Sequence, residues 1–534
     1  MIKTKTNDHQ TQVIIIGAGL AGMIAACAAE AEGARVLLLD RSALGLGTNS
    51  ALSNGVFAGP TPGYSEEAYV EDTLRIGRGL NRRSWVEQVA REAPKVIESL
   101  NSFGLELKPF KDHFSVQPAP PGTIPGVTLV RRIAEKVRSL NPVRVITGFQ
   151  VTEMLTHDHR VFGVRGFDDQ GRDQAFFAPA VILAAGGFGA VYQRNDNQKS
   201  TLGQGVALAA RAGLDLWDME FVQFYPLVLA QPGLPSLLLY PPYPREARLV
   251  NQSGQDLLEK FGLQSLHEAI MQLRDVFSVK LFEEMEQSGT VYLDYRGVPA
   301  DSWSRFPLTL LSRIKYDFQN KPFAVAPAAH FCMGGLRTDE RGRTDLTGLL
   351  ACGEMVWGLH GANRRGGNAL TECLVSGRLA GSQAAIEALS SPPLRKGMPP
   401  TGDGFAYSPV PAFGEIRALH QTLKEIAWRQ AGVVRSRTGL TDGLARLQEL
   451  EDCLAGLKPG AVPERKRLED LRSALLVTRA ILTAGLAREE SRGSFIRVDF
   501  TDEDNLRWRK NSRLTYVPDK NNFEVDYVDV WGGT

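Results

Sequence analysis

The stretch Val13-Ile14-Ile15-Ile16-Gly17-Ala18-Gly19-Leu20-Ala21-Gly22 decides the fold of this chain. A short apolar strand runs into a G-x-G-x-x-G turn and a helix at residues 20–33, and a second apolar strand, ARVLLLD, follows at residues 34–40. In such a β-α-β unit the glycines allow a tight turn, close approach of a pyrophosphate, and close packing of helix on strand. The helix N-terminus attracts phosphate, and the acid that ends the second strand can accept hydrogen bonds from a ribose. We therefore expect a dinucleotide to contact Gly17, Gly19, Gly22 and Asp40.

A second glycine-rich element, VILAAGGFG at residues 181–189, reads as a strand that runs into glycines. Such a strand returns to the main sheet and passes the dinucleotide, which places Ala185 and Gly186 at the cofactor. Taken alone, the element is equally consistent with a buried strand that has a flexible exit. Neither motif distinguishes FAD from NAD.

Composition excludes several classes of protein. A chain of 534 residues is too long for one hydrophobic core, and its 43% apolar and 23% charged residues are those of an ordinary globular protein. A net charge of +1 gives no broad field for nucleic acid or an anionic membrane. The five cysteines include no C-x-x-C pair, so we expect neither a disulfide framework nor a metal or iron–sulfur site, and we expect a cytoplasmic location. Residues 13–29 are apolar, but a buried strand and helix explain them better than a signal sequence or membrane insertion does.

The remaining pattern suggests several domains. We expect helical structure at residues 66–103, short strands at 143–185, a mixed region at 200–323, and a return to the dinucleotide domain with a helix at 368–389. A segment rich in Pro, Gly and Ser at residues 390–413 reads as a linker. Three helices are expected after it, at residues 414–434, 439–457 and 464–488, and a polar tail that wraps over another domain.

The second half of the chain carries a resemblance. It reads APAAHFCMGGLRTD from Ala326 and GLLACGEMVWGLHGANRRGGNALTECLVSGR from Gly348. With DMEFVQFYP, LRDVFS and AREESRG, these motifs resemble the flavoprotein family of fumarate reductase, succinate dehydrogenase and L-aspartate oxidase, over nearly the whole chain. The spacing before GLHGANR and the GGNAL sequence look closer to soluble fumarate reductases than to L-aspartate oxidase.

The resemblance implies an α/β fold: a split Rossmann-like FAD-binding domain with an inserted α+β capping domain and a C-terminal helical bundle domain. The corresponding boundaries are residues 1–225 and 335–390 for the FAD-binding domain, 226–334 for the capping domain, 391–413 for a linker, and 414–534 for the helical domain and tail. Further FAD contacts implied by the family motifs are Asn49, Ser50, Gly55, Glu354, Asn368, Ala369 and Leu370. Several relatives attach FAD to a histidine, but the matching segment GTNSALSNG has Thr48 at about that place, so FAD is expected to be non-covalent.

The family motifs also imply a substrate site. Arg274 matches the arginine that delivers a proton to a C=C bond, and His330 and Arg364 match a pair that clamps a substrate carboxylate. His360 and Arg365 are further candidates for substrate binding. His360 is equally consistent with a structural role, and Arg365 stands where the family commonly has an apolar residue, so its charge could face the pocket or a partner.

Two departures from the family pattern affect the other end of the substrate. Tyr225 replaces a carboxylate-binding histidine, and LYPPYPRE at residues 239–246 replaces a loop that carries a threonine. A site that loses polar donors rejects the ligand that used them. We therefore expect a carboxylate other than fumarate, with Tyr225 contacting it.

Three functions remain open. The first is an FAD-dependent reductase or dehydrogenase of CH–CH bonds that exchanges electrons with a separate iron–sulfur or flavin subunit. The second is an electron-transfer subunit with a vestigial pocket. The third is amine oxidation of the L-aspartate oxidase type, which the GGNAL sequence and the altered pocket oppose.

Overall fold

A five-stranded parallel sheet forms the centre of the protein, whose computed structural model describes residues 11–392 and 407–530, with only the backbone of residues 271 and 272. The strand order is β17-β10-β1-β2-β6, and all four neighbouring pairs run parallel. These strands are β1 (Val13–Ile16), β2 (Val36–Leu39), β6 (Val143–Ile146), β10 (Ala180–Leu183) and β17 (Leu349–Ala351). The β-α-β unit predicted from residues 13–40 is therefore confirmed.

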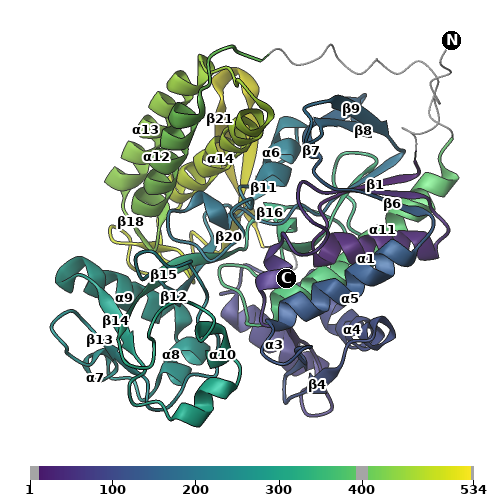
Figure 1. The fold of residues 1–534 in the computed structure, drawn as a ribbon. Helices are drawn as coiled ribbons and strands as arrows, with labels where there is room; N and C mark the ends of the chain where they lie inside the picture. Colours follow the sequence, from purple (N-terminus) through teal and green to yellow (C-terminus); the bar gives the residue numbers. More distant parts are fainter. Residues whose placement is uncertain (1–10, 393–406, 531–534) are drawn as a thin grey trace.

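Both faces of this sheet are covered, which explains why its strands are apolar throughout. Val13 and Ile15 pack among helices, whereas Ile14 and Ile16 pack in a different cluster with the meander that follows β6. The helices are α1 (Leu20–Ala31), α5 (Pro125–Ser139) and α11 (Asn368–Ser390), and α1 packs against the other two, as Figure 1 shows. The meander on the other face is the predicted run of short strands, β7 (Gln150–His157), β8 (Arg160–Phe167) and β9 (Asp173–Phe177).

The predicted helical region at residues 66–103 is confirmed, with a break. It comprises α3 (Glu66–Ile76), α4 (Arg83–Ser99) and a final 3₁₀ turn at Leu100–Phe103. Around it lie α2 (Asn49–Leu52), β3 (Val56–Ala58), β4 (Leu107–Pro109) and β5 (His113–Val116), the strands forming a small sheet in the order β3-β5-β4.

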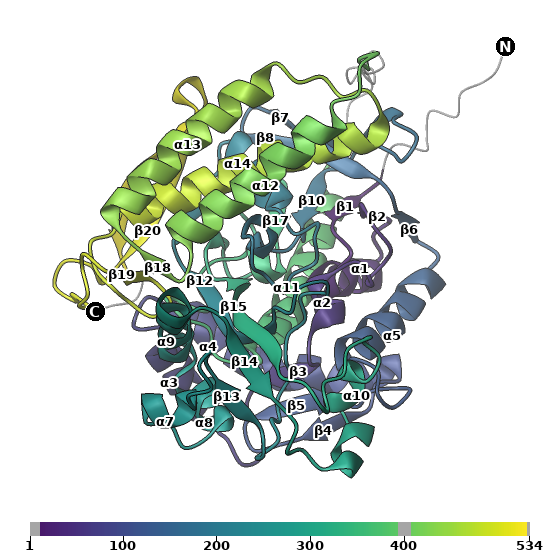
Figure 2. The same ribbon diagram turned by 60° about the vertical axis from the view of Figure 1, so that its left-hand side comes forward.

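The inserted region forms its own antiparallel sheet in the order β12-β15-β14-β13. Its strands are β12 (Val222–Leu229), β13 (Arg248–Val250), β14 (Val291–Asp294) and β15 (Phe323–Cys332), and its helices are α7 (Leu257–Phe261), α8 (Leu266–Gln272), α9 (Arg274–Ser288) and α10 (Leu308–Leu311). Figure 2 shows this capping region below the parallel sheet. Helix α6 (Gln204–Arg211) precedes it.

The three C-terminal helices form the expected bundle: α12 (Phe413–Ala431), α13 (Arg437–Ala455) and α14 (Val462–Ala487), at the upper left of Figure 1. The tail does wrap over another domain, but it does so as a hairpin that the sequence did not predict. Strands β20 (Lys510–Val517) and β21 (Asn522–Asp529) extend β11 (Leu216–Trp217) and β16 (Gly335–Leu336), and β18 (Val434–Arg435) pairs with β19 (Ile496–Arg497). Most of the predicted linker, residues 393–406, lies outside the described residues.

Helices α11 and α14 are long enough to cross a bilayer, but their sequences are too polar. No helix within residues 11–392 and 407–530 combines the length and the hydropathy that a membrane span needs.

Candidate active site and cofactor cleft

The turn between β1 and α1 has the geometry that its glycines predict. Gly17 has a φ of +104°, and a Cβ atom there would lie 2.3 Å from the Ala184 carbonyl oxygen. A Cβ at Gly22 would lie 1.9 Å from the Gly17 oxygen, so helix and turn touch directly. The helix begins at Gly19 without a side-chain cap, and its N-terminus faces a cavity. An uncapped helix N-terminus of this kind attracts phosphate.

That cavity is an open cleft with about 980 Å³ of empty space, counting the part open to solvent. Its wall includes eight of the thirteen predicted cofactor residues, namely Gly17, Gly19, Asp40, Asn49, Ser50, Ala185, Gly186 and Glu354. The other five predicted residues, Gly22, Gly55, Asn368, Ala369 and Leu370, are not part of the described wall.

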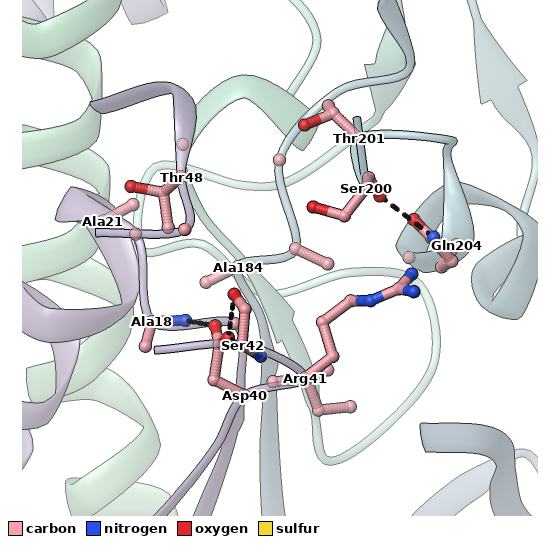
Figure 3. A pocket seen from close by; sticks show the side chains of 18 of the residues that line it. Ala18, Ala21, Asp40, Arg41, Ser42, Thr48, Ala184, Ser200, Thr201 and Gln204 are labelled. Carbon is pink, nitrogen blue, oxygen red and sulfur yellow. Dashed lines mark hydrogen bonds between the residues drawn. The ribbon is translucent and has the colours of Figure 1, made fainter. Parts of the chain in front are cut away.

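Asp40 stabilises the glycine turn through hydrogen bonds. Its carboxylate accepts hydrogen bonds from the Ala18 N–H at 2.6 Å and from the Ser42 N–H and hydroxyl at 2.7 and 2.9 Å (Figure 3). Burial raises the pKa of Asp40, and these donors oppose that effect. Since a carboxylate has about four acceptor positions, one remains for the predicted ribose hydroxyl.

Glu354 is a half-buried carboxyl group in the cavity wall. Its side chain accepts a hydrogen bond from the Cys332 N–H at 3.2 Å. Burial raises its pKa to about 7, although the donors around it and the charge of Arg364 act in the opposite direction. A carboxylate has about four acceptor positions, so Glu354 can accept a further hydrogen bond besides those from Cys332, Gly187 and Asn49. A ribose hydroxyl would supply one, which fits the FAD contact that we expected at this position.

The C-terminal bundle reaches the cavity through Asp470 of α14. Asp470 forms two hydrogen bonds with Arg41, at 2.6 and 2.7 Å, and accepts further bonds from Gln204 at 2.9 Å and Gln150 at 3.2 Å. Arg41, Gln150 and Gln204 line the cavity, and Arg41 and Gln204 point toward one another in Figure 3. None of the three was predicted from the sequence, because a polar side chain in a meander or a helix gives no local signal of a distant partner.

The N-terminus of α11 lies near the candidate substrate site instead of in the cavity wall. Asn368 is buried, where it accepts a hydrogen bond from the Tyr69 hydroxyl at 3.0 Å and donates one to Thr73. A Cβ atom at Gly366 would lie 3.3 Å from an Nη atom of Arg274. The turn at residues 366–370 therefore connects the flavin domain with the substrate residues.

Four of the predicted substrate residues come together. The Arg274 guanidinium lies over the Tyr225 ring, 5.7 Å from its centroid, and the Tyr225 and His330 rings are 5.3 Å apart. The Arg364 guanidinium lies over Phe331, the neighbour of His330, at 4.6 Å. These residues come from β12, α9, β15 and the loop before α11, so the fold assembles the site from the capping region and the FAD-binding domain.

The cluster holds two arginines, and neither forms an ion pair with a carboxylate of the described residues. Arg364 is 6% exposed and donates from Nε to Gln223 at 3.1 Å. Burial, and then repulsion from Arg274, lowers the pKa of Arg364 to about 9. Arg274 Nε is buried and has no hydrogen-bond partner among the described residues. His330 Nδ1 lies 2.7 Å from an Asp196 carboxylate oxygen, which leaves Nε2 for a ligand. Such a site is arranged to bind an anion.

The structure does not bring His360 and Arg365 into this cluster. His360 Nε2 lies 2.9 Å from Glu372, and both side chains are buried. Arg365 pairs with Asp112 at 2.7 Å and lies over the rings of Tyr64 and Tyr69. Both residues are therefore held by carboxylates of other segments.

Sequence reasoning missed the residues that hold the clamp in place. Gln223 binds Arg364 through both its side-chain atoms and Asp196 binds His330. Gln223 lies two residues before Tyr225, inside a motif that was recognised, whereas Asp196 lies in a polar loop that carries no signal.

Comparison with known proteins agrees with this geometry. A family model described as FAD binding domain matches residues 12–370, and one described as fumarate reductase flavoprotein C-term matches residues 420–532. The chain is 32% identical to L-aspartate oxidase of Streptomyces coelicolor, over 95% of this chain and 92% of the relative. It is also 32% identical to a fumarate reductase (CoM/CoB) subunit of Methanothermobacter marburgensis, over 95% of this chain and 97% of that relative.

Among solved structures, the quinol fumarate reductase FrdA of E. coli superposes with a TM-score of 0.84 at 25% identity, covering 98% of this chain and 97% of that one. The α/β FAD-binding domain, the capping domain and the C-terminal helical domain are thus all shared. The chain belongs to the FAD-binding flavoprotein family of fumarate reductase, succinate dehydrogenase and L-aspartate oxidase, and is an FAD-dependent oxidoreductase of that family.

Proposed function

We propose that this protein reduces, or forms in reverse, the C=C bond of a carboxylic acid. The observation that carries the proposal is the approach of two guanidiniums, those of the buried Arg364 and the half-buried Arg274, which repel one another, while the Arg274 Nε is buried without a hydrogen-bond partner among the described residues. The link to the cofactor is Glu354, which lines the cavity and accepts a hydrogen bond from Cys332, two residues after His330. Bound FAD would supply two-electron chemistry beside this cluster.

The residues divide the work as follows. Arg364 and His330 hold the substrate carboxylate, because a planar cationic fork and a ring N–H suit its two oxygens. Reduction of the C=C bond needs a hydride, which the flavin would supply after a partner has reduced it by two electrons, and a proton on the other carbon, which we assign to Arg274. Asp275, the next residue along α9, is half-buried, and desolvation raises its pKa to about 6, so a second proton-exchanging group lies close to Arg274. Arginine is a weak acid and needs such help.

We extend the proposal to the substrate, the FAD linkage, the redox partner and the location of the protein. Fumarate is not the expected substrate, because Tyr225 occupies the position of a carboxylate donor. We expect FAD to be non-covalent, since Thr48 lines the cavity where a histidine would be needed. One relative is named as a subunit, which supports an electron-exchanging iron–sulfur or flavin partner for this chain. A reducing, cytoplasmic setting would suit five cysteines that are free in the described structure.

The decisive experiment is reoxidation of the chemically reduced, FAD-loaded protein by a panel of α,β-unsaturated acids without oxygen. At least one acid should reoxidise the flavin, and Arg274→Ala should abolish this while FAD stays bound. The matched control is Arg305→Ala, which removes an exposed arginine of the capping region. If no acid reoxidises the protein, the result would favour the alternative function, an electron-transfer subunit with a vestigial pocket. A separate test is acid precipitation, after which a yellow pellet would show covalent FAD.

Amine oxidation is the second candidate, because several relatives at about this level of identity, including the Streptomyces coelicolor protein, are named L-aspartate oxidase. Reduction of the oxidised flavin by L-aspartate, without oxygen, would establish it. The absence of such reduction, together with reoxidation by an unsaturated acid, would favour the reductase.

A further inference from the structure

We infer that the subsite beside Tyr225 accepts a neutral, apolar end of the substrate, so that the protein acts on monocarboxylic unsaturated acids with an aromatic or alkyl substituent and rejects dicarboxylates. This inference rests on the proposed function and specifies its substrate class. It follows from the direction of the hydrogen bonds of three tyrosines, because a hydroxyl group has only one proton to donate.

Tyr243 fixes the direction of the first two bonds. Its hydroxyl lies 2.7 Å from the Leu239 carbonyl oxygen, and a carbonyl can only accept, so Tyr243 donates there. The same hydroxyl lies 2.8 Å from that of Tyr225. Since the proton of Tyr243 is already used, Tyr225 must be the donor in this second bond. The Tyr225 oxygen is therefore left with lone pairs and no proton for a ligand.

Tyr240, the other tyrosine of the loop, also uses its hydroxyl proton within the protein. Tyr240 donates its hydroxyl proton to the Leu52 carbonyl oxygen of α2, and its ring packs against Phe306 at 5.6 Å. Tyr225, Tyr240 and Tyr243 are all less than 10% exposed. Together they form an aromatic wall, here called the tyrosine wall, whose hydroxyl protons are all bound within the protein.

The tyrosine wall borders the anion-binding cluster directly, because the Tyr225 ring contacts both Arg274 and His330. A carboxylate held by Arg364 and His330 satisfies the cations on its side. A second carboxylate on the far side would face the lone pairs of Tyr225 and aromatic surface. The cation that contacts this ring, Arg274, is assigned to the reacting C=C bond and so would not be free to hold that carboxylate. Burying a charge without donors costs several kcal/mol, whereas an aromatic ring gains from contact with such a wall.

The test is isothermal titration calorimetry on the FAD-loaded wild-type protein with three probes: trans-3-phenylacrylate, crotonate and fumarate. Phenylacrylate should bind about 100-fold more tightly than fumarate, with crotonate between them. Fumarate binding within tenfold of phenylacrylate, or tighter, would overturn the inference, as would failure of phenylacrylate to bind.

A variant tests the hydrogen-bond direction itself. In Tyr243→Phe the acceptor for Tyr225 is gone, so the Tyr225 proton is free for a ligand, and fumarate should bind about tenfold more tightly than to wild type. The matched control is Tyr316→Phe, which removes another capping-region hydroxyl that donates to a carbonyl, that of Pro322, and should leave the fumarate affinity unchanged. No gain in Tyr243→Phe, or an equal gain in the control, contradicts the assignment. If Tyr243→Phe does not fold, the wild-type affinity ratio decides.

Binding and turnover separate this inference from the proposed function. Tight phenylacrylate binding without reoxidation of the reduced flavin would refute the reductase and support the specificity of the subsite. Reoxidation by fumarate and phenylacrylate with equal affinities would support the reductase and refute the specificity.

Discussion

Replacing Arg364 should stabilise the protein and at the same time abolish its binding of acids. Arg364 is buried, its charge is opposed by Arg274, and its only hydrogen bond from the guanidinium to a described side chain goes to Gln223. Its guanidinium lies over the Phe331 ring, so Arg364→Met replaces it with an apolar side chain that can contact the same ring and removes the charge. A buried charge that is retained for binding is a cost to the ligand-free protein.

The structure gives the size of this cost. Lowering the pKa of Arg364 from its ordinary 12.5 to about 9 corresponds to about 5 kcal/mol, at about 1.4 kcal/mol for each tenfold change in ionisation. The sign follows from linkage: a base whose pKa is depressed on folding destabilises the folded state at every pH below about 9, and the penalty fades only as pH rises toward 12.5. Loss of the hydrogen bond to Gln223 destabilises the variant by about 2 kcal/mol and so reduces this gain. A net stabilisation of about 3 kcal/mol is expected at neutral pH.

The assay compares thermal unfolding of the FAD-loaded wild type and variant, with and without trans-3-phenylacrylate. Arg364→Met should unfold at a temperature higher by at least about 3 °C. The acid should raise the midpoint of the wild type and leave that of the variant unchanged. Arg365→Met is the matched control, since Arg365 is as buried but paired with Asp112, and its loss should lower the midpoint. A lower midpoint for Arg364→Met would refute the reasoning.

Three further predictions concern the cofactor cavity and the clamp. Gly17→Ala places a Cβ atom 2.3 Å from the Ala184 oxygen at a φ of +104°, so the purified variant should lack flavin absorbance, and a fully FAD-loaded variant would contradict this. Glu354 has a folded-state pKa raised from 4.5 to about 7, so the FAD-free protein should lose thermal stability as the pH rises through this window, and Glu354→Gln should flatten that loss. An identical pH slope in the two proteins would be inconsistent with a half-buried, ionising Glu354. Asp196→Asn removes the charge partner of His330 and should weaken phenylacrylate binding about threefold to tenfold in calorimetry with FAD retained; an unchanged affinity would mean that Asp196 does not orient the clamp.

The flavin half of the molecule could be predicted from sequence because its determinants are local. The turn at Gly17 needs residues that are neighbours along the chain, and the strand, helix and second strand follow one another within residues 13–39. The three C-terminal helices were predicted for the same reason, since each carries its own periodicity.

What could not be predicted depends on contacts between distant segments. Asp470 reaches Arg41 across more than four hundred residues, and nothing in the sequence of α14 marks it as part of the cavity. The hairpin of β20 and β21 has eight residues per strand, but its apolar side becomes evident only because β11 completes the sheet. Polar tails with weak alternation are therefore poorly assigned from sequence alone.

Adjacent arginines show the same limit within the site. Arg364 and Arg365 are equal in type and nearly equal in burial, and both were candidates for substrate contact, Arg364 by its match to the family motif and Arg365 as an extra charge beside it. Only the fold separates them, because Asp112 approaches one and Arg274 the other. A charge is available to a substrate when the protein itself leaves it without a counter-ion.

A hydroxyl proton is likewise available to a substrate only when the protein does not bind it, and the protons of the tyrosine wall are all bound. The bond from Tyr240 to the Leu52 carbonyl joins the capping region to α2, beside the residues of the cofactor cavity. The same loop that lacks donors for a second carboxylate therefore also fastens the two domains together. Each hydroxyl proton that stabilises this closed arrangement is one that a dicarboxylate cannot use, so the structural role of the loop and its selection against dicarboxylates have a common physical cause.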